Sequence, residues 1–248
     1  MFISATTGSF RQLDLEAACD KITELQFDKV ELTFDENGSQ LKPSEVAADP
    51  NRLYSQMREF TRLSPVAFQI VSHIEGDQFE GICMAAKLMR VAQITVASVP
   101  LGTPFNEELD RLKKLTAIGN AEGVRVSMMT TSGQLTQDAH TAAELCQSCK
   151  GLGVSLDPSH LELESSQNSN YDMLYDYTYH AYLRDSSPKQ LQMPVGLGDM
   201  DFAKLITALA RVNYNRLLSV DIDPELVSGE TTIELEMRKL RMLLESLL

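Results

Sequence analysis

Short apolar, β-branched runs alternate along the chain with longer segments in which apolar residues recur every three or four positions. The first pattern is typical of buried strands and the second of amphipathic helices. The segment after the first run begins with Asp14 as a candidate N-cap, and the last segment begins with a Thr231…Glu234 capping box. The predicted strands cover residues 1–6, 29–34, 66–73, 93–99, 124–130, 152–157, 179–185 and 216–222.

This alternation predicts the fold class and the number of domains. About eight strand–helix units in 248 residues suit an α/β fold of the (β/α)₈ TIM-barrel type. A doubly wound sheet is the alternative, but no Gly-x-Gly-x-x-Gly turn follows the first predicted strand. No Pro/Gly/Ser-rich linker interrupts the pattern, so we expect one domain over residues 1–248.

Polar and ionisable residues follow several of these predicted strands. In the stretch "SLDPSHL", an aspartate and a histidine, Asp157 and His160, come where an apolar run ends. A carboxylate beside an imidazole suits a divalent cation or a sugar hydroxyl, although Asp-Pro-Ser is also a good turn former. In a barrel, strand ends meet at one face, and this convergence favours a site. The other residues of this kind are His73, Met129, Tyr182, Arg184, Asp185 and Asp221.

Composition narrows the classes of partner. The formal net charge is −13, which opposes binding to nucleic acids and to anionic membranes. The first ten residues lack a basic segment followed by a long apolar one, so we expect no signal peptide. Cys146 and Cys149 form a Cys-x-x-Cys with no second pair to complete a zinc site. These features favour a cytoplasmic protein with free thiols and a small-molecule ligand.

A series of motifs from residue 123 to 225 resembles the xylose isomerase-like TIM barrels. These motifs are "GVRVSMMT", "GLGVSLDPSHL", "YHAYLRDS", "VGLGDMDF" and "RLLSVDI", in that order. That superfamily includes sugar and sugar-phosphate isomerases and epimerases, inosose dehydratases and endonuclease IV. The resemblance covers nearly the whole chain and implies a divalent metal that polarises substrate oxygens during proton transfer next to a carbonyl.

The resemblance assigns roles to three residues. The family's metal-binding Asp matches Asp157, and the His that usually touches substrate matches His160. The final metal-binding acid matches Asp221, which is one methylene shorter than the usual Glu. We therefore expect Asp157, His160 and Asp221 as catalytic residues, with Asp157 and Asp221 as metal ligands.

Two other metal ligands of the family are replaced. The first Glu falls on Met129 and the metal-binding His falls on Tyr182, whereas the first His of the His-x-His pair is kept as His180. A thioether binds hard cations poorly, and a phenol seldom ionises. We therefore expect Mn²⁺, Mg²⁺ or Zn²⁺ to bind weakly if at all, and ligand counting predicts that Met129→Glu with Tyr182→His would tighten the site. His180 is interpreted as a buried structural residue.

Further residues are candidates for contact with substrate. His73 would lie at the rim of the site or bond only to a loop carbonyl. Arg184 would be a site guanidinium oriented by Asp185, or the two would form only a salt bridge. Gly196 and Gly198 would allow close approach of a ligand to the backbone. The substrate-binding set predicted from the sequence is His73, His160, Arg184, Gly196 and Gly198.

Three functions compete. The first is a sugar or sugar-phosphate isomerase or epimerase with a weakened metal site. The second is a barrel that has lost metal catalysis and binds a small polyhydroxylated ligand, or has a structural or regulatory role. The third, an abasic-site nuclease, needs a zinc cluster that four histidines cannot supply, and the net charge opposes it. We favour the first.

Overall fold

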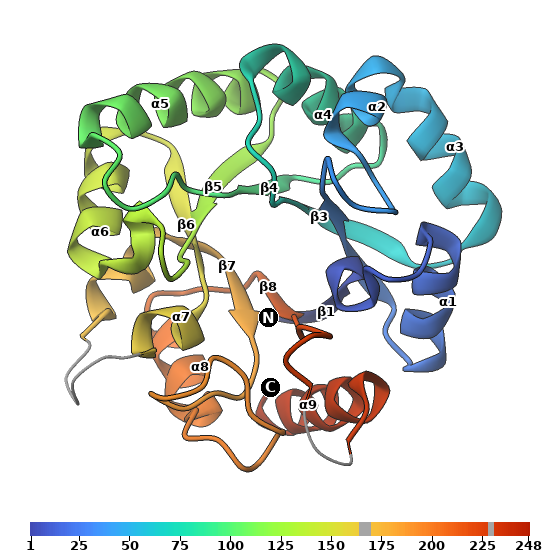
Figure 1. The fold of residues 1–248 in the computed structure, drawn as a ribbon, viewed down its shortest axis with the longest axis vertical. Coiled ribbons are helices and arrows are strands. Elements are labelled where there is room, and N and C mark those ends of the chain that lie inside the picture. The colour runs from blue at the N-terminus through green and yellow to red at the C-terminus, as the bar shows by residue number, and fades with distance from the viewer. Residues whose placement is uncertain (164–169, 228–230) are drawn as a thin grey trace.

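Eight parallel strands form a closed barrel in the order β1 to β8 (Figure 1). The barrel closes where β1 pairs with β8, with Phe2 level with Leu217 and Ala5 level with Val220. The computed structural model describes residues 1–163, 170–227 and 231–248. This confirms the predicted single-domain TIM barrel. The strands are β1 Phe2–Thr6, β2 Lys29–Phe34, β3 Ser64–Ile70, β4 Gln93–Val96, β5 Arg125–Met129, β6 Leu152–Leu156, β7 Thr178–Leu183 and β8 Leu217–Val220.

The helices form a ring outside the barrel (Figure 1). Within the described part of the chain, no helix is both long and apolar enough to span a bilayer. The helices are α1 Leu15–Glu24, α2 Pro43–Ala48, α3 Pro50–Phe60, α4 Gly76–Leu88, α5 Phe105–Ala121, α6 Ala139–Ser148, α7 Pro158–Glu162, α8 Phe202–Arg211 and α9 Ile233–Leu247. Short 3₁₀ turns occur at η1 Thr7–Phe10, η2 Leu135–Gln137 and η3 Asp172–Tyr177.

Helix starts follow the expected capping chemistry with one shift. The Asp14 side chain accepts a hydrogen bond from Ala17 N and begins α1, as the sequence predicts. At α9 the prediction of Thr231 as the cap is wrong by one residue. Thr232 is the N-cap and accepts from Leu235 N, while the Thr231 hydroxyl donates to a carboxylate further along α9.

Successive strand residues face alternately outward and into the barrel. In β6, Val154 and Leu156 are fully buried and belong to the apolar core, whereas Ser155 between them bonds to Thr95 of β4. Since β4 and β6 are not neighbours in the barrel, this bond must cross its interior. The same period of two brings the residue two positions after Ser155, Asp157, to the inner side at the end of the strand.

Inside the barrel, hydroxyl groups form a connected chain of hydrogen bonds. The Gln93 amide donates to the Ser127 hydroxyl at 2.5 Å. The Ser127 and Ser155 hydroxyls are 2.6 Å apart, and Ser155 lies 2.7 Å from the Thr95 hydroxyl. All four side chains are buried. These bonds satisfy the three hydroxyl groups and the Gln93 amide nitrogen, which would otherwise be buried without partners.

The chain continues to Glu31. Thr95 hydrogen-bonds to the Tyr182 phenol, which in turn donates to Glu31 Oε1 at 2.6 Å. Burial raises the pKa of Glu31 to about 8, although hydrogen bonds from Tyr182 and Ser219 oppose the shift. His180, 2.7 Å from the Ser219 hydroxyl, is fully buried as predicted, and burial lowers its pKa to about 3. Both groups are therefore neutral near pH 7.

Candidate functional site

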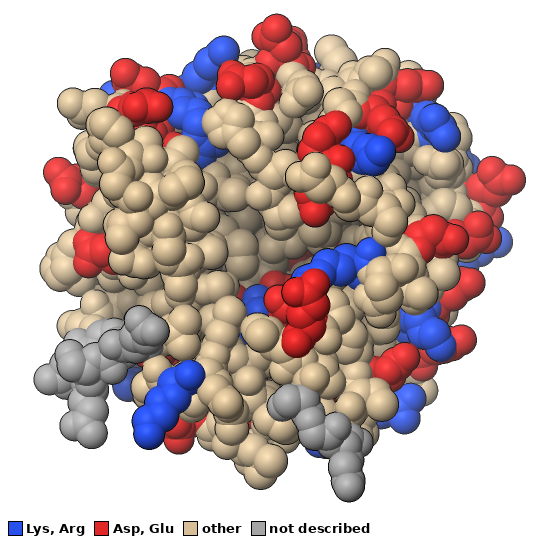
Figure 2. All heavy atoms as spheres, viewed as in Figure 1, with Lys and Arg blue, Asp and Glu red and all other residues tan. Residues whose placement is uncertain are grey.

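A cavity of about 690 Å³ opens where the carboxyl ends of the strands meet, and it is lined by both polar and apolar side chains. Figure 2 shows a hollow near the middle of this face, with basic and acidic side chains beside it. In TIM barrels this end of the barrel carries the functional site. Polar residues that line the cavity include Arg11, Thr33, Asp35, Gln40, Gln69, His160, Arg184, Asp221 and Asp223.

Asp157 is the first residue after β6 and is fully buried beneath the cavity. Its Oδ1 atom accepts from Ser159 N at 3.0 Å and from the Ser159 hydroxyl. Asp157 is therefore the N-cap of the short helix α7. Its Oδ2 atom faces Arg184 instead. The turn chemistry and the site suggested by the sequence therefore coexist, each using a different oxygen.

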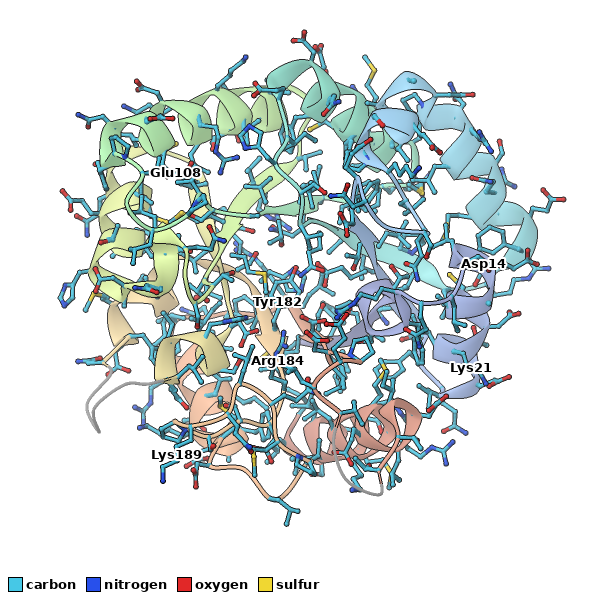
Figure 3. All side chains as sticks on the ribbon, in the orientation of Figure 1. Asp14, Lys21, Glu108, Tyr182, Arg184 and Lys189 are labelled. Atoms are coloured by element: carbon cyan, nitrogen blue, oxygen red, sulfur yellow. The ribbon has the colours of Figure 1, made fainter. Side chains whose placement is uncertain are left out.

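Arg184 lies between two carboxylates near the centre of the barrel (Figure 3). Its Nη2 atom is 3.1 Å from Asp157 Oδ2 and 2.7 Å from Asp221 Oδ2. Burial lowers the pKa of Arg184, but the charges of Asp157 and Asp221 raise it, and the net shift is upward. The guanidinium is a permanent cation and is only 5% exposed.

Asp221 is the carboxylate of this group that reaches the cavity. Leu183 of β7 pairs with Val220 of β8, so the residues that follow, Arg184 and Asp221, lie level with each other. The Thr6 hydroxyl of β1 donates to Asp221 Oδ1 at 3.1 Å. Asp221 therefore ties the ends of three neighbouring strands together and still presents a carboxylate edge to a ligand.

His160 lies on α7 at the wall of the cavity. Its Nδ1 atom accepts from Ser132 N at 3.2 Å, and this bond assigns the ring proton to Nε2. Nε2 is 3.9 Å from Asp157 Oδ2, beyond hydrogen-bond distance. Burial lowers the pKa of His160, partly offset by the charge of Asp157. The imidazole is thus neutral at pH 7 and can donate to an oxygen in the cavity.

The two residues that replace the expected ligands lie at different depths. Met129 lines the cavity, and its sulfur accepts from Gln69 Nε2 at 3.6 Å. Tyr182 is fully buried below the cavity and donates to Glu31. Burial and the neighbouring Glu31 hold the pKa of Tyr182 well above its usual value, so the phenol stays neutral.

Three predicted substrate contacts are not brought to the cavity. His73 lies beyond the end of β3, 62% exposed, and its Nε2 atom is 3.1 Å from Glu75 Oε1. Gly196 and Gly198 donate backbone N–H groups to Asp185 Oδ2 at 2.8 and 3.1 Å. The glycines therefore allow close approach of the Asp185 carboxylate, which is engaged with the loop and does not orient Arg184.

Sequence reasoning missed a second ion pair at the cavity. Arg11 follows η1, and its Nη2 atom is 2.8 Å from Asp223 Oδ1 and 2.9 Å from Glu225 Oε1. These residues lie in the loops after β1 and β8, just beyond the strand ends considered above. Extending the search by a few residues past each strand would have found them.

The donor atoms at the mouth do not fit a divalent cation. The Oδ2 atoms of Asp157 and Asp221 both contact the same nitrogen of Arg184, so a cation between them would overlap that nitrogen. Met129 offers sulfur, and Tyr182 lies outside the cavity lining as a neutral phenol. Among the described residues, no group of three or more His, Cys, Asp or Glu is placed to hold a metal ion.

A closed parallel barrel with alternating helices and a cavity at the carboxyl ends of its strands is a (β/α)₈ TIM barrel. The family can be stated more narrowly. The family model described as "Xylose isomerase-like TIM barrel" matches residues 19–243, and the chain belongs to this family. This confirms the resemblance drawn from the sequence motifs.

Solved structures with the same fold are distant in sequence. A D-psicose 3-epimerase with D-tagatose from Clostridium cellulolyticum H10 has a TM-score of 0.76 and 13% identity, with 100% of this chain and 99% of that chain covered. A 3-keto-D-glucoside 4-epimerase from E. coli has a TM-score of 0.72 and 14% identity, with 99% of this chain and 99% of that chain covered. A xylose isomerase-like TIM barrel protein from Mycobacterium smegmatis in complex with magnesium has a TM-score of 0.80 and 11% identity. The match covers 99% of this chain and 96% of that chain. A comparison with curated protein sequences gave no match.

Proposed function

We propose that the protein is a sugar isomerase or epimerase-like barrel that binds an uncharged sugar in the cavity at its mouth. One observation carries the proposal. The neutral donor His160, the cation Arg184 and the carboxylate of Asp221 all line one cavity. Donors beside an acceptor suit a ligand that carries both a carbonyl and hydroxyl groups. Membership of the xylose isomerase-like family supports the same ligand class.

The charges at the mouth favour an uncharged sugar over a sugar phosphate. The described lining contains two cations, Arg11 and Arg184. Each already contacts two carboxylates. A phosphate would therefore meet no unpaired cation there and would face several acidic oxygens, which repel it. The hydroxyl groups of a neutral sugar can instead donate to these oxygens.

The arrangement also suits proton transfer next to a carbonyl. The Asp221 carboxylate takes a proton from the carbon beside the carbonyl, the electron pair of that C–H bond forms a C=C bond, and the π pair of the carbonyl moves onto its oxygen. N–H groups of His160 and Arg184 stabilise the charge on that oxygen. Return of this proton from Asp221 to the former carbonyl carbon, with transfer of the neighbouring hydroxyl proton to the enolate oxygen, gives an isomer. Delivery of a solvent proton to the opposite face of the original carbon, while Asp221 releases its proton to solvent, gives an epimer. Asp157 is a positioning residue, since it contacts Arg184 from below the cavity.

Exchange of carbon-bound hydrogen with solvent tests this chemistry. D-Tagatose, D-allulose, D-fructose and the ketopentoses are incubated with the protein in D₂O, and deuterium incorporation is followed by NMR. We expect incorporation with at least one ketose and at least hundredfold slower exchange in Asp221→Asn. Asp199→Asn, outside the cavity lining, is the control and should exchange normally. If no ketose of the panel binds and none exchanges its carbon-bound hydrogen, the proposal is contradicted.

A non-catalytic sugar-binding barrel is the second candidate. Both oxygens of Asp221 already accept hydrogen bonds, from Thr6 and from Arg184. A substrate C–H group would therefore have to compete with these two contacts for access to the carboxylate. Calorimetric binding of a neutral sugar without any deuterium incorporation would establish this alternative.

The cysteines support our proposal of a cytoplasmic location. All four are free and buried. Burial raises the pKa of Cys19, Cys83 and Cys146 to about 12, so these thiols stay protonated and unreactive. Free thiols of this kind persist in a reducing compartment. The Cys-x-x-Cys pair is a packing feature of α6 and the residue after it.

A further inference from the structure

We propose that Arg184 is a built-in cation that takes the position of a divalent metal, so that this site works without one. The inference concerns only the charges below the cavity and does not depend on which sugar binds there. It begins with the contact of one nitrogen, Arg184 Nη2, with Asp157 Oδ2 at 3.1 Å and with Asp221 Oδ2 at 2.7 Å. No other described Lys or Arg side chain forms an ion pair with either carboxylate.

The remaining oxygens of the two carboxylates are also engaged. Asp157 Oδ1 accepts from the backbone and the hydroxyl of Ser159, and Asp221 Oδ1 accepts from Thr6. A divalent cation bound by both Oδ2 atoms would lie about 2.0–2.6 Å from each of them. That volume is held by the Arg184 nitrogen. A metal could enter only if the guanidinium moved away.

Burial makes such a movement costly. The Arg184 side chain is 5% exposed, and its Nε atom is buried with no hydrogen-bond partner, so the polar contacts that hold it are those of Nη2 described above. Asp157 is fully buried. Separating this cation from its carboxylates would leave unpaired charges in the interior, which costs several kcal/mol per charge. The guanidinium therefore occupies the space between the two carboxylates and offsets one of their two charges.

His160 is set for hydrogen-bond donation, which differs from the state needed to bind a metal. A metal-binding imidazole nitrogen must be deprotonated. The bond from Ser132 N to Nδ1 places the proton on Nε2, the atom nearer to Asp157. Together with the guanidinium, the site offers N–H donors to a ligand oxygen where a metal enzyme would offer a Lewis acid.

Removing the guanidinium should expose the hidden metal-binding capacity of these residues. In Arg184→Met, Asp157 and Asp221 face each other without a cation. We expect Mn²⁺ titration by calorimetry to show at least tenfold tighter binding than for the native chain. Arg184→Met with Asp221→Asn should lose this gain. Arg58→Met removes an arginine that contacts Tyr54 and lies outside the cavity lining, and it is the control, with no gain expected.

Two results would overturn the proposal. The first is micromolar Mn²⁺ binding by the native chain that Asp157→Asn abolishes, because the guanidinium would then move aside for a metal. The second is a folded Arg184→Met variant that binds Mn²⁺ no more tightly than the native chain. If the variant is unfolded without metal, its thermal unfolding is followed with and without Mn²⁺. Failure of Mn²⁺ to raise its Tm would count equally against the proposal.

Discussion

Arg184 and Asp221 are joined by a 2.7 Å contact between Nη2 and Oδ2 at the adjacent ends of β7 and β8. The contact lies level across the two strands because Leu183 and Val220, the residues before them, are paired. This ion pair thus links the ends of β7 and β8 and places a cation beside the Asp221 carboxylate at the cavity. Several measurable consequences depend on it.

The Arg184 guanidinium should contribute strongly to stability. Truncating one partner of a buried ion pair leaves the other charges uncompensated, and we expect Arg184→Met to lower the free energy of unfolding by about 3 kcal/mol. Urea denaturation at pH 7 measures this change. Adding Asp157→Asn should recover part of the loss, since it removes one unpaired charge. Arg11→Met is the comparison: that side chain is 44% exposed, and its loss should cost less than about 1 kcal/mol. Equal losses for the two arginines would contradict this account.

Glu31 should make the protein less stable as pH rises. Its folded pKa of about 8 lies above the ordinary value of 4.5, so the folded state keeps a proton that the unfolded chain has released. This contribution to stability is complete below pH 4.5 and is lost as pH rises towards 8, by at most about 1.4 kcal/mol per pH unit. Glu31→Gln is neutral throughout and should lack that loss. Denaturation curves of both proteins between pH 5 and 8.5 provide the test.

His180 acts in the opposite direction over a lower range. Its folded pKa of about 3 lies below the ordinary value of 6.5, so its contribution is complete above pH 6.5 and is lost as the unfolded chain takes up a proton below it. Between pH 4.5 and 6.5 the two trends offset each other. The difference between native and Glu31→Gln proteins isolates the glutamate. A difference that does not change with pH would show that Glu31 ionises normally.

Restoring the missing metal ligands should fail while Arg184 is present. Ligand counting alone predicts that Met129→Glu with Tyr182→His builds a site. The structure changes that expectation, because Tyr182 is buried beneath the cavity and the cation position is taken by the guanidinium. We expect this pair of substitutions to bind Mn²⁺ only when combined with Arg184→Met. Calorimetry on the double and triple variants decides, and tight binding by the double variant would refute the expectation.

The alternation of inward- and outward-facing side chains along each strand is the feature of the site that the sequence could reveal. Ser155 and Asp157 share one side of β6, and Ser219 and Asp221 share one side of β8, so the two acids point inward at strand ends. Arg184 lies two positions after Tyr182 and therefore faces the same side of the barrel wall. This position identified Arg184 as a candidate site residue. The pattern could not show which partners its long side chain would choose, because that choice depends on three strands at once.

Loop geometry accounts for what the sequence could not place. The run of residues 66–73 continues past the last paired residue of β3, Ile70, so His73 falls on the surface. Gly196 and Gly198 suggested close approach of a ligand to the backbone, whereas the group that lies against them is the Asp185 carboxylate, which nothing local in the sequence identifies. Loops have no repeating pattern from which such a contact could be read.

The loop after β7 should depend on Gly198 more than on Gly196. A Cβ atom at Gly198 would lie 2.1 Å from Asp185 Oδ1 and 2.6 Å from Ser186 O, so Gly198→Ala must displace the loop at a cost of about 3 kcal/mol. A Cβ at Gly196 meets nothing within 4 Å, and its φ of +91° adds only conformational strain of about 1 kcal/mol. Thermal unfolding of the two alanine variants tests this ranking, and the reverse order would disprove it.

The hydroxyl chain inside the barrel has a direction. Gln93 can only donate to Ser127 through its amide nitrogen, and at the far end Tyr182 donates to Glu31. Each hydroxyl has one hydrogen, so every hydrogen bond of the chain must have the same direction. The donors follow one another from Gln93 through Ser127, Ser155, Thr95 and Tyr182 to Glu31. The protons therefore have one shared arrangement instead of several independent ones. No single link can reverse on its own, because the Gln93 amide nitrogen cannot accept a hydrogen bond and each hydroxyl has only one hydrogen, so the O–H dipoles keep one common sense along the chain.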